Sequence, residues 1–259
     1  MLKRALGFCL ATLLIVPACT SDKAKDVDVE AEIARNLGEA DANLRNDKVA
    51  EAEAGYKVVL GYDATNAAAL TGLGRVELAR EQPAAAIEPL EKAIAAAPND
   101  AKAHATLGQA YVATNDWAKA ADHLGKAWEL DKDTEQYALE YGAALREAKQ
   151  LDAAITVLQE VAAINPQIKY VYRELGKAQL DASDHDKALE SFMKAQLAWP
   201  GDQDSFAGAG MVYEAQGKIG DSIDQWAQYI QQDCCSTYSK EIAQPKIAEL
   251  KAKENAAPN

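Results

Sequence analysis

Several absences limit what this chain can be. It has three histidines, His104, His123 and His185, and no two stand one helical turn apart, as a pair of metal ligands on a helix would. It has no glycine-rich phosphate loop and no nucleophile elbow. Aspartate and glutamate are plentiful but fall on predicted exposed helix faces. The sequence therefore indicates no enzyme, no resident cofactor and no metal site.

Basic residues are also scarce. The chain has 27 lysines and arginines against 40 acidic residues, a net charge of −13, and without residues 1–18, which carry two basic residues and no acidic one, the balance is −15. Such a charge repels nucleic acid and anionic lipid surfaces. A protein partner is therefore expected, and a nucleic acid is not.

The first residues form a targeting signal. Lys3 and Arg4 precede an apolar stretch over 5–16, which is too short to span a bilayer and has the length of a signal-peptide core. The stretch ends in small residues directly before Cys19. Residues 1–18 are therefore expected to be a signal peptide.

The end of that stretch resembles the lipobox of bacterial lipoproteins, in the residues Val16-Pro17-Ala18-Cys19. The resemblance implies cleavage before Cys19 and lipidation of its sulfur, with residues 19–32 as the lipidated N-terminus and tether. Thr20 follows, so no aspartate retains the protein at the inner membrane, and an outer-membrane lipoprotein facing the periplasm of a Gram-negative cell is expected. The alternative is an ordinary signal peptide with an incidental cysteine.

Cys234 and Cys235 are adjacent, and they are the thiols that remain once Cys9 is cleaved off and Cys19 is lipidated. In an oxidising compartment they can close a strained ring across one peptide bond. We expect a structural disulfide that stiffens the loop. A redox-active pair, a bridge to a partner and a metal site are the alternatives.

A 34-residue period fills the rest of the chain. A dipeptide ending in glycine recurs at this spacing, at Leu73-Gly74, Leu107-Gly108, Tyr141-Gly142, Leu175-Gly176 and Ala209-Gly210. Large apolar residues recur at the same spacing, at Leu90, Leu124, Leu158, Phe192 and Trp226. Within each unit the apolar residues have helical spacing, and turn residues divide the unit in two. The units are 33–66, 67–100, 101–134, 135–168, 169–202 and 203–236, followed by a capping helix within 237–259. Asp100 and Asp202 stand where they can cap the next helix.

This pattern resembles the tetratricopeptide repeat (TPR). The resemblance implies an all-α, right-handed solenoid of six helix pairs plus the C-terminal capping helix, with a concave groove for a protein segment. Carried onto this chain, the family's groove positions include Arg75, Lys102, Arg146, Tyr170, Arg173, Lys177 and Met211.

The charges at these positions suggest a preference. Six of the groove positions are basic and five are acidic, so the groove is expected to be less negative than the rest of the chain, with a basic-aromatic patch at Tyr170, Arg173 and Lys177. An extended or helical peptide with acidic and apolar side chains would suit it. The alternative is that these are ordinary solvated residues whose positive and negative charges are distributed by chance.

Repeat number, lipid signal and length together resemble the pilotin lipoproteins of type IV pilus systems, of the PilF, PilW and Tgl kind. That resemblance implies a scaffold that helps a secretin ring to assemble in the outer membrane. The alternative is a general periplasmic adaptor for peptidoglycan enzymes or outer-membrane assembly factors. The oligomeric state stays open.

Overall fold

A computed structural model describes residues 28–256, and over this range the predicted all-helical solenoid is confirmed. The first helices of the six pairs are α1 (Val29–Arg45), α3 (Ala67–Ala79), α5 (Ala101–Ala113), α7 (Glu135–Glu147), α9 (Val171–Asp181) and α11 (Gln203–Ala215). The second helices are α2 (Val49–Tyr62), α4 (Pro83–Ala96), α6 (Trp117–Leu130), α8 (Leu151–Ile164), α10 (His185–Ala198) and α12 (Ile219–Gln232). A π-helical turn η1 (Ser239–Ala243) leads into α13 (Gln244–Ala256).

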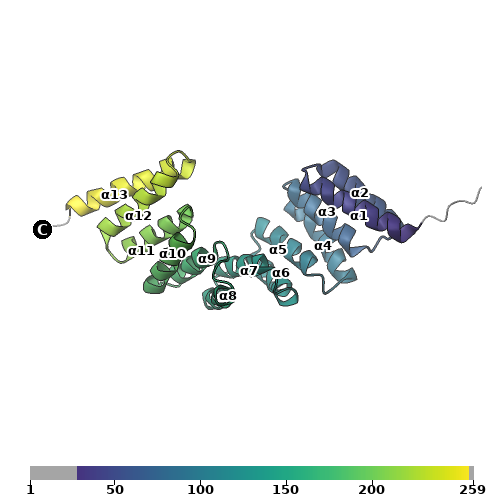
Figure 1. Cartoon of the computed structure of the whole chain (residues 1–259), viewed down its shortest axis with the longest axis horizontal. Helices are drawn as coiled ribbons and strands as arrows, with labels where there is room; N and C mark the ends of the chain where they lie inside the picture. The colour runs from purple at the N-terminus through teal and green to yellow at the C-terminus, as the bar shows by residue number, and fades with distance from the viewer. Residues whose placement is uncertain (1–27, 257–259) are drawn as a thin grey trace, which may run out of the picture.

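The stack is elongated and bent, and its two ends rise on the same side of α7 and α8 (Figure 1). In the middle of the molecule α5 and α7 lie on the inner side of the bend, while α6 and α8 lie on the outer side. Each helix packs mainly on its neighbours in the sequence, as in a solenoid. The bend therefore gives the first helices a concave surface.

The first helix begins earlier than the predicted unit boundary. Residues 29–32, which the sequence placed in the tether, belong to α1. The side chain of Asp28 accepts a hydrogen bond from the backbone N–H of Ala31, and Glu30 and Glu32 in the first turn favour the positive end of the helix dipole. Cys19, the signal peptide and most of the predicted tether lie outside the described residues.

The turns inside the six pairs share one backbone conformation. A left-handed residue occurs every 34 positions, at Asp47, Glu81, Asn115, Lys149, Ser183 and Gly217. Only the last of these is a glycine, although glycine adopts this conformation most easily. The fixed turn reverses the chain in the same way each time and keeps the pairs in register.

Five of the six pairs are closed by a contact between a glycine and a bulky side chain sixteen residues later. The pairs are Gly74–Leu90, Gly108–Leu124, Gly142–Leu158, Gly176–Phe192 and Gly210–Trp226. A Cβ atom at Gly142 would lie 2.7 Å from Cγ of Leu158, which real Cβ atoms do not tolerate. The bulky partners are fully or almost fully buried. The glycine therefore sets how closely the two helices approach.

The C-terminal helix covers the last pair. Ala243 and Leu250 are buried and pack into a cluster with Trp226 and Tyr229 of α12. This covering gives the last repeat the apolar neighbour that a solenoid end otherwise lacks. Each helix between residues 28 and 256 is too short or too polar to cross a lipid bilayer.

His104 and His123, nineteen residues apart in the sequence, meet between α5 and α6. Nδ1 of His104 lies 3.2 Å from Nδ1 of His123, and Nε2 of His104 lies 3.1 Å from the carbonyl oxygen of Pro98. The ring of His123 also stacks on Tyr111. Burial and then the neighbouring His104 lower the pKa of His123, and Asp122 and Glu91 oppose this only in part. Proton binding to His123 is therefore disfavoured in the folded state.

We predict that adding a methyl group at Gly142 destabilises the fold. Gly142→Ala should lower the free energy of unfolding by about 1–3 kcal/mol through overpacking against Leu158, although alanine favours helix. Gly38→Ala is the matched control, because its Cβ atom would meet nothing within 4 Å, and it should raise stability by about 0.5–1 kcal/mol. Urea titrations measure both. Equal effects of the two variants would contradict the close-approach explanation.

We predict a pH dependence from the histidine pair. Because the pKa of His123 is lowered in the folded state, the unfolded chain binds more protons below about pH 6.5, so stability present above that pH is lost as the pH falls. His123→Gln should flatten the stability curve between about pH 5 and 7, and His185→Gln, away from the pair, should not. Thermal unfolding across this range is the measurement. A wild-type curve no steeper than that of His123→Gln would refute the prediction.

Candidate functional site

Three hollows adjoin one another along the inner side of the stack. One of about 300 Å³ lies between α5 and α7, one of about 190 Å³ lies between α7 and α9, and a further one of about 300 Å³ lies between α9 and α11. Glu140 and Ala143 line both the first and the second, and Arg146 lines both the first and the third. The hollows therefore form one continuous groove, here called the central groove, across four first helices.

Most of the predicted groove residues line the central groove. Arg146, Lys177 and Met211 surround the hollow between α9 and α11, and Tyr170 and Arg173 line the hollow between α7 and α9. The remaining two predicted residues stand apart: Arg75 lies on α3 and Lys102 on α5, and neither lines these three hollows.

Tyr170 has a position that its repeat register did not predict. The sequence placed it inside the first helix of its unit, but α9 begins only at Val171, and Tyr170 precedes it in a left-handed conformation with φ of 74°. The guanidinium carbon of Arg173 lies 4.0 Å from the centre of its ring, and the ammonium of Lys169 lies 4.5 Å from it. A basic-aromatic patch is therefore present, with the ring held outside the helix between two cations.

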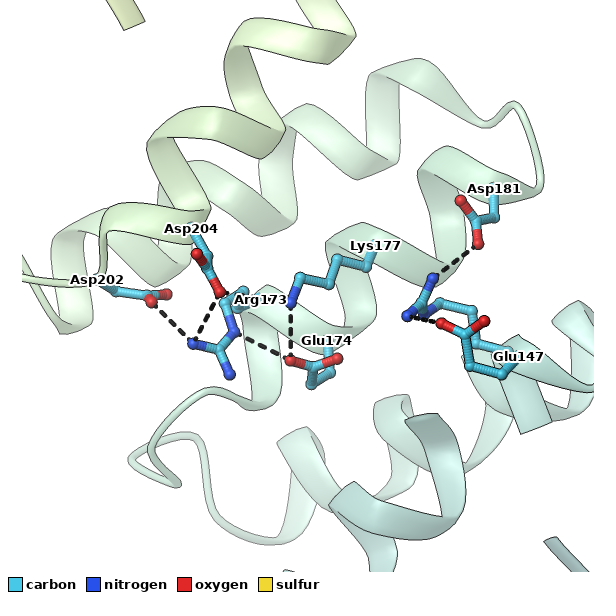
Figure 2. A network of polar contacts seen from close by, with 8 residues as sticks. Glu147, Arg173, Glu174, Lys177, Asp181, Asp202 and Asp204 are labelled. Atoms are coloured by element: carbon cyan, nitrogen blue, oxygen red, sulfur yellow. Dashed lines mark hydrogen bonds and ion pairs between the residues drawn. The ribbon is translucent and has the colours of Figure 1, made fainter. Parts of the chain in front are cut away.

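The basic residues of the central groove are engaged by carboxylates of the same surface. Figure 2 shows Arg173 directed toward Asp202 and Asp204, and Lys177 directed toward Glu174. The closest distances are 3.0 Å from Arg173 Nη1 to Asp202 Oδ1 and 3.3 Å from Lys177 Nζ to Glu174 Oε1. The positive charge of the predicted basic-aromatic patch is thus largely neutralised from within the protein.

Arg146 is paired in the same way between neighbouring repeats. Its Nη1 lies 3.0 Å from Asp181 Oδ2 on α9, and its Nη2 contacts Glu147. These contacts fix the guanidinium at the junction of two hollows. Arg146 therefore serves as a bridge between α7 and α9 as well as a lining residue.

The N-terminal repeats carry an equivalent pair. Asp41 on α1 accepts hydrogen bonds from the hydroxyl of Tyr56, at 2.6 Å, and from Nη1 of Arg75, at 2.8 Å. Burial alone would raise the pKa of Asp41, but the Tyr56 hydrogen bond and the charges of Lys102 and Arg75 outweigh it, and the pKa is lowered overall. Arg75 thus joins two repeats and is not a free cation.

The predicted capping role is confirmed for Asp100 and wrong for Asp202. Asp100 accepts from the backbone N–H groups of Lys102 and Ala103, whereas the Asp202 side chain makes no capping hydrogen bond and instead accepts from Arg173. Burial raises the pKa of Asp202, and the attraction of Arg173 offsets only part of that rise. Burial lowers the pKa of Arg173, but Glu174 and Asp202 outweigh it and raise that pKa overall.

Cys234 and Cys235 lie between α12 and η1 as exposed, free thiols, so the disulfide stays a prediction. Neither cysteine lines any of the three hollows, although Tyr238, three residues after Cys235, does. Within residues 28–256 no three histidine, cysteine, aspartate or glutamate side chains gather as metal ligands would.

Several lining residues stand outside the groove positions predicted from the sequence, among them Trp117, Glu140 and Tyr238. Trp117 begins α6, Glu140 lies on α7 outside the family's usual groove positions, and Tyr238 comes from the segment before η1. A signal existed for Glu140, because Glu174 stands 34 residues later at the equivalent position and also lines the groove. Tyr238 follows the last repeat, so no repeat register could place it.

Comparisons with known proteins define the class. Models of the tetratricopeptide repeat match residues 37–101 and 173–237, and a second model of the same repeat matches residues 77–140. The chain belongs to the tetratricopeptide repeat family, whose members act as scaffolds for protein–protein interaction. No curated protein matches the chain.

Solved structures share the fold at low sequence identity. PilF of Pseudomonas aeruginosa is 14% identical with a TM-score of 0.68, and the match covers 84% of this chain and 99% of that one. A tetratricopeptide repeat protein of Parabacteroides merdae is 12% identical with a TM-score of 0.71, covering 87% and 89%. YrrB, described as a TPR protein with an unusual peptide-binding site, is 17% identical with a TM-score of 0.59, covering 73% and 97%.

We predict that Arg173 is needed to hold Asp202 as a buried anion. Arg173→Met should cost about 2–3 kcal/mol of unfolding free energy, because the Asp202 side chain, 4% exposed, loses its cation. Adding Asp202→Asn should restore a good part of the loss, and the single variant should recover at acid pH as Asp202 is protonated. Urea titrations at two pH values measure this. A single variant as stable as the wild type would contradict the role.

Proposed function

We propose that this protein is a lipid-anchored adaptor that holds a segment of a protein partner in its central groove. The observation that carries the proposal is the continuity of the three hollows, which share Glu140, Ala143 and Arg146. An extended or helical segment lying along α5, α7, α9 and α11 would place successive side chains in successive hollows.

The lining suits a polypeptide better than a small metabolite. Apolar side chains such as Val112, Leu180 and Met211 alternate with charged groups, most of which already have ion-pair partners. Each hollow is open and has room for one or two side chains rather than a whole buried ligand. Binding would therefore draw on several small contacts distributed over four helices.

We further propose that the adaptor works at the outer membrane and assists assembly of a type IV pilus secretin. Support comes from the lipobox-like residues that end in Cys19, and from the fit of the repeat domain to nearly the full length of PilF. The same architecture supports a second candidate, a periplasmic adaptor for cell-wall enzymes or assembly factors. The similarity to YrrB, a TPR protein with a peptide-binding site, favours peptide capture without pointing to pili.

Photo-crosslinking in cells tests the proposal. Met211 is 41% exposed in the groove, and Met193 is 53% exposed on α10 outside the three hollows, so the same photoreactive residue at these two sites forms a matched pair. A secretin subunit captured from position 211 and not from 193 is the expected result. Capture of a cell-wall enzyme or assembly factor from 211 alone would favour the second candidate.

Equal or stronger capture from position 193 than from position 211 would contradict binding in the central groove. If position 193 captures the same partner as strongly as position 211, binding takes place on another surface. If position 211 captures nothing while 193 does, the outer face is the binding site.

A further inference from the structure

None of the basic side chains that line the three hollows is free to receive an acidic ligand. The three basic side chains that line it are all paired: Arg146 with Asp181, Arg173 with Asp202, and Lys177 with Glu174. A ligand carboxylate would have to displace one of these partners, and the displaced carboxylate of the protein would lose its cation. The acidic peptide expected from the sequence is therefore a poor match for this part of the groove.

One lining carboxylate lacks such a partner. Glu140 is half-buried on α7, and no lysine or arginine nitrogen from residues 28–256 lies within ion-pair distance of it, in contrast to Glu147, Glu174, Asp181 and Asp204. Its charge is therefore uncompensated at the place where two hollows meet.

Two amides orient this carboxylate. Nε2 of Gln109 on α5 donates to Oε2 of Glu140 at 2.9 Å, and Nε2 of Gln136 donates to Oε1 at 2.9 Å. Amide donors fix the direction of a carboxylate without cancelling its charge. Since each carboxylate oxygen can accept two hydrogen bonds, both oxygens of Glu140 keep an acceptor site.

An apolar surface lies directly beside the charge. The hollow between α5 and α7 is lined by Val112, Trp117, Ala143 and Ala144 next to Glu140. A ligand that fills it must bring an apolar side chain, and a neighbouring cation would meet the carboxylate in a partly desolvated setting, where an ion pair is stronger than in open water.

We infer that the partner segment carries a lysine or arginine next to an apolar side chain, with the cation on Glu140 and the apolar side chain between α5 and α7. This rests on the proposed groove binding and specifies its ligand. The net charge of −13 acts in the same direction, because an acidic protein attracts a cationic partner at long range.

The test uses a random dodecapeptide library displayed on phage and selected against the full-length protein. Selected peptides are sorted by whether Ala143→Trp, which fills the two hollows that Ala143 lines, abolishes their binding. Those that need an open groove should be enriched in lysine or arginine beside an apolar residue. Glu140→Gln should weaken them about five- to tenfold at low salt, and added salt should reduce this difference.

Glu129→Gln is the control, because it removes the same charge from an exposed site on α6 and should leave the affinities within about twofold. Groove-dependent peptides that are acidic or neutral, or that bind Glu140→Gln as well as the wild type, would overturn the inference and leave groove binding intact. If no selected peptide responds to Ala143→Trp, groove binding fails and this inference fails with it.

Discussion

The close approach of two helices at a single glycine is the contact on which this molecule depends. Gly142 against Leu158, and its equivalents in four other pairs, leave no room for a Cβ atom. That contact fixes the spacing within a pair, and the left-handed turn between the helices fixes their direction. Because both recur every 34 residues, the pairs stack with a constant offset and the first helices come to line one concave side.

The charged side chains on that concave side have two different roles. Arg75, Arg146 and Arg173 each contact a carboxylate about one repeat away in the sequence, so they tie neighbouring pairs together. A solenoid has few long-range contacts, and such cross-repeat pairs add to the apolar packing between its units. Glu140 takes no part in this cross-repeat pairing with cations, so its negative charge is available to a cation of a bound segment.

The repeat register could be predicted from the sequence, because glycine and bulky side chains at fixed spacing are direct consequences of helix packing. The ion pairs could not, since register shows that Arg173 and Asp204 face one side but not that they touch. Lysine and glutamate do not favour a left-handed conformation, so the sequence around Lys149 and Glu81 does not reveal it. Asp202 stands at a typical helix N-cap position, but its side chain pairs with Arg173 and does not cap the helix. Tyr238 joins the groove from beyond the repeats, where periodicity carries no information.

Hydrogen–deuterium exchange of the full-length protein, with and without the partner captured from position 211, tests most directly whether the concave side is the binding surface. We predict added protection in α5, α7, α9 and α11, with the strongest change around Glu140, and little change in α6, α8 and α10. Protection concentrated in those second helices would contradict it.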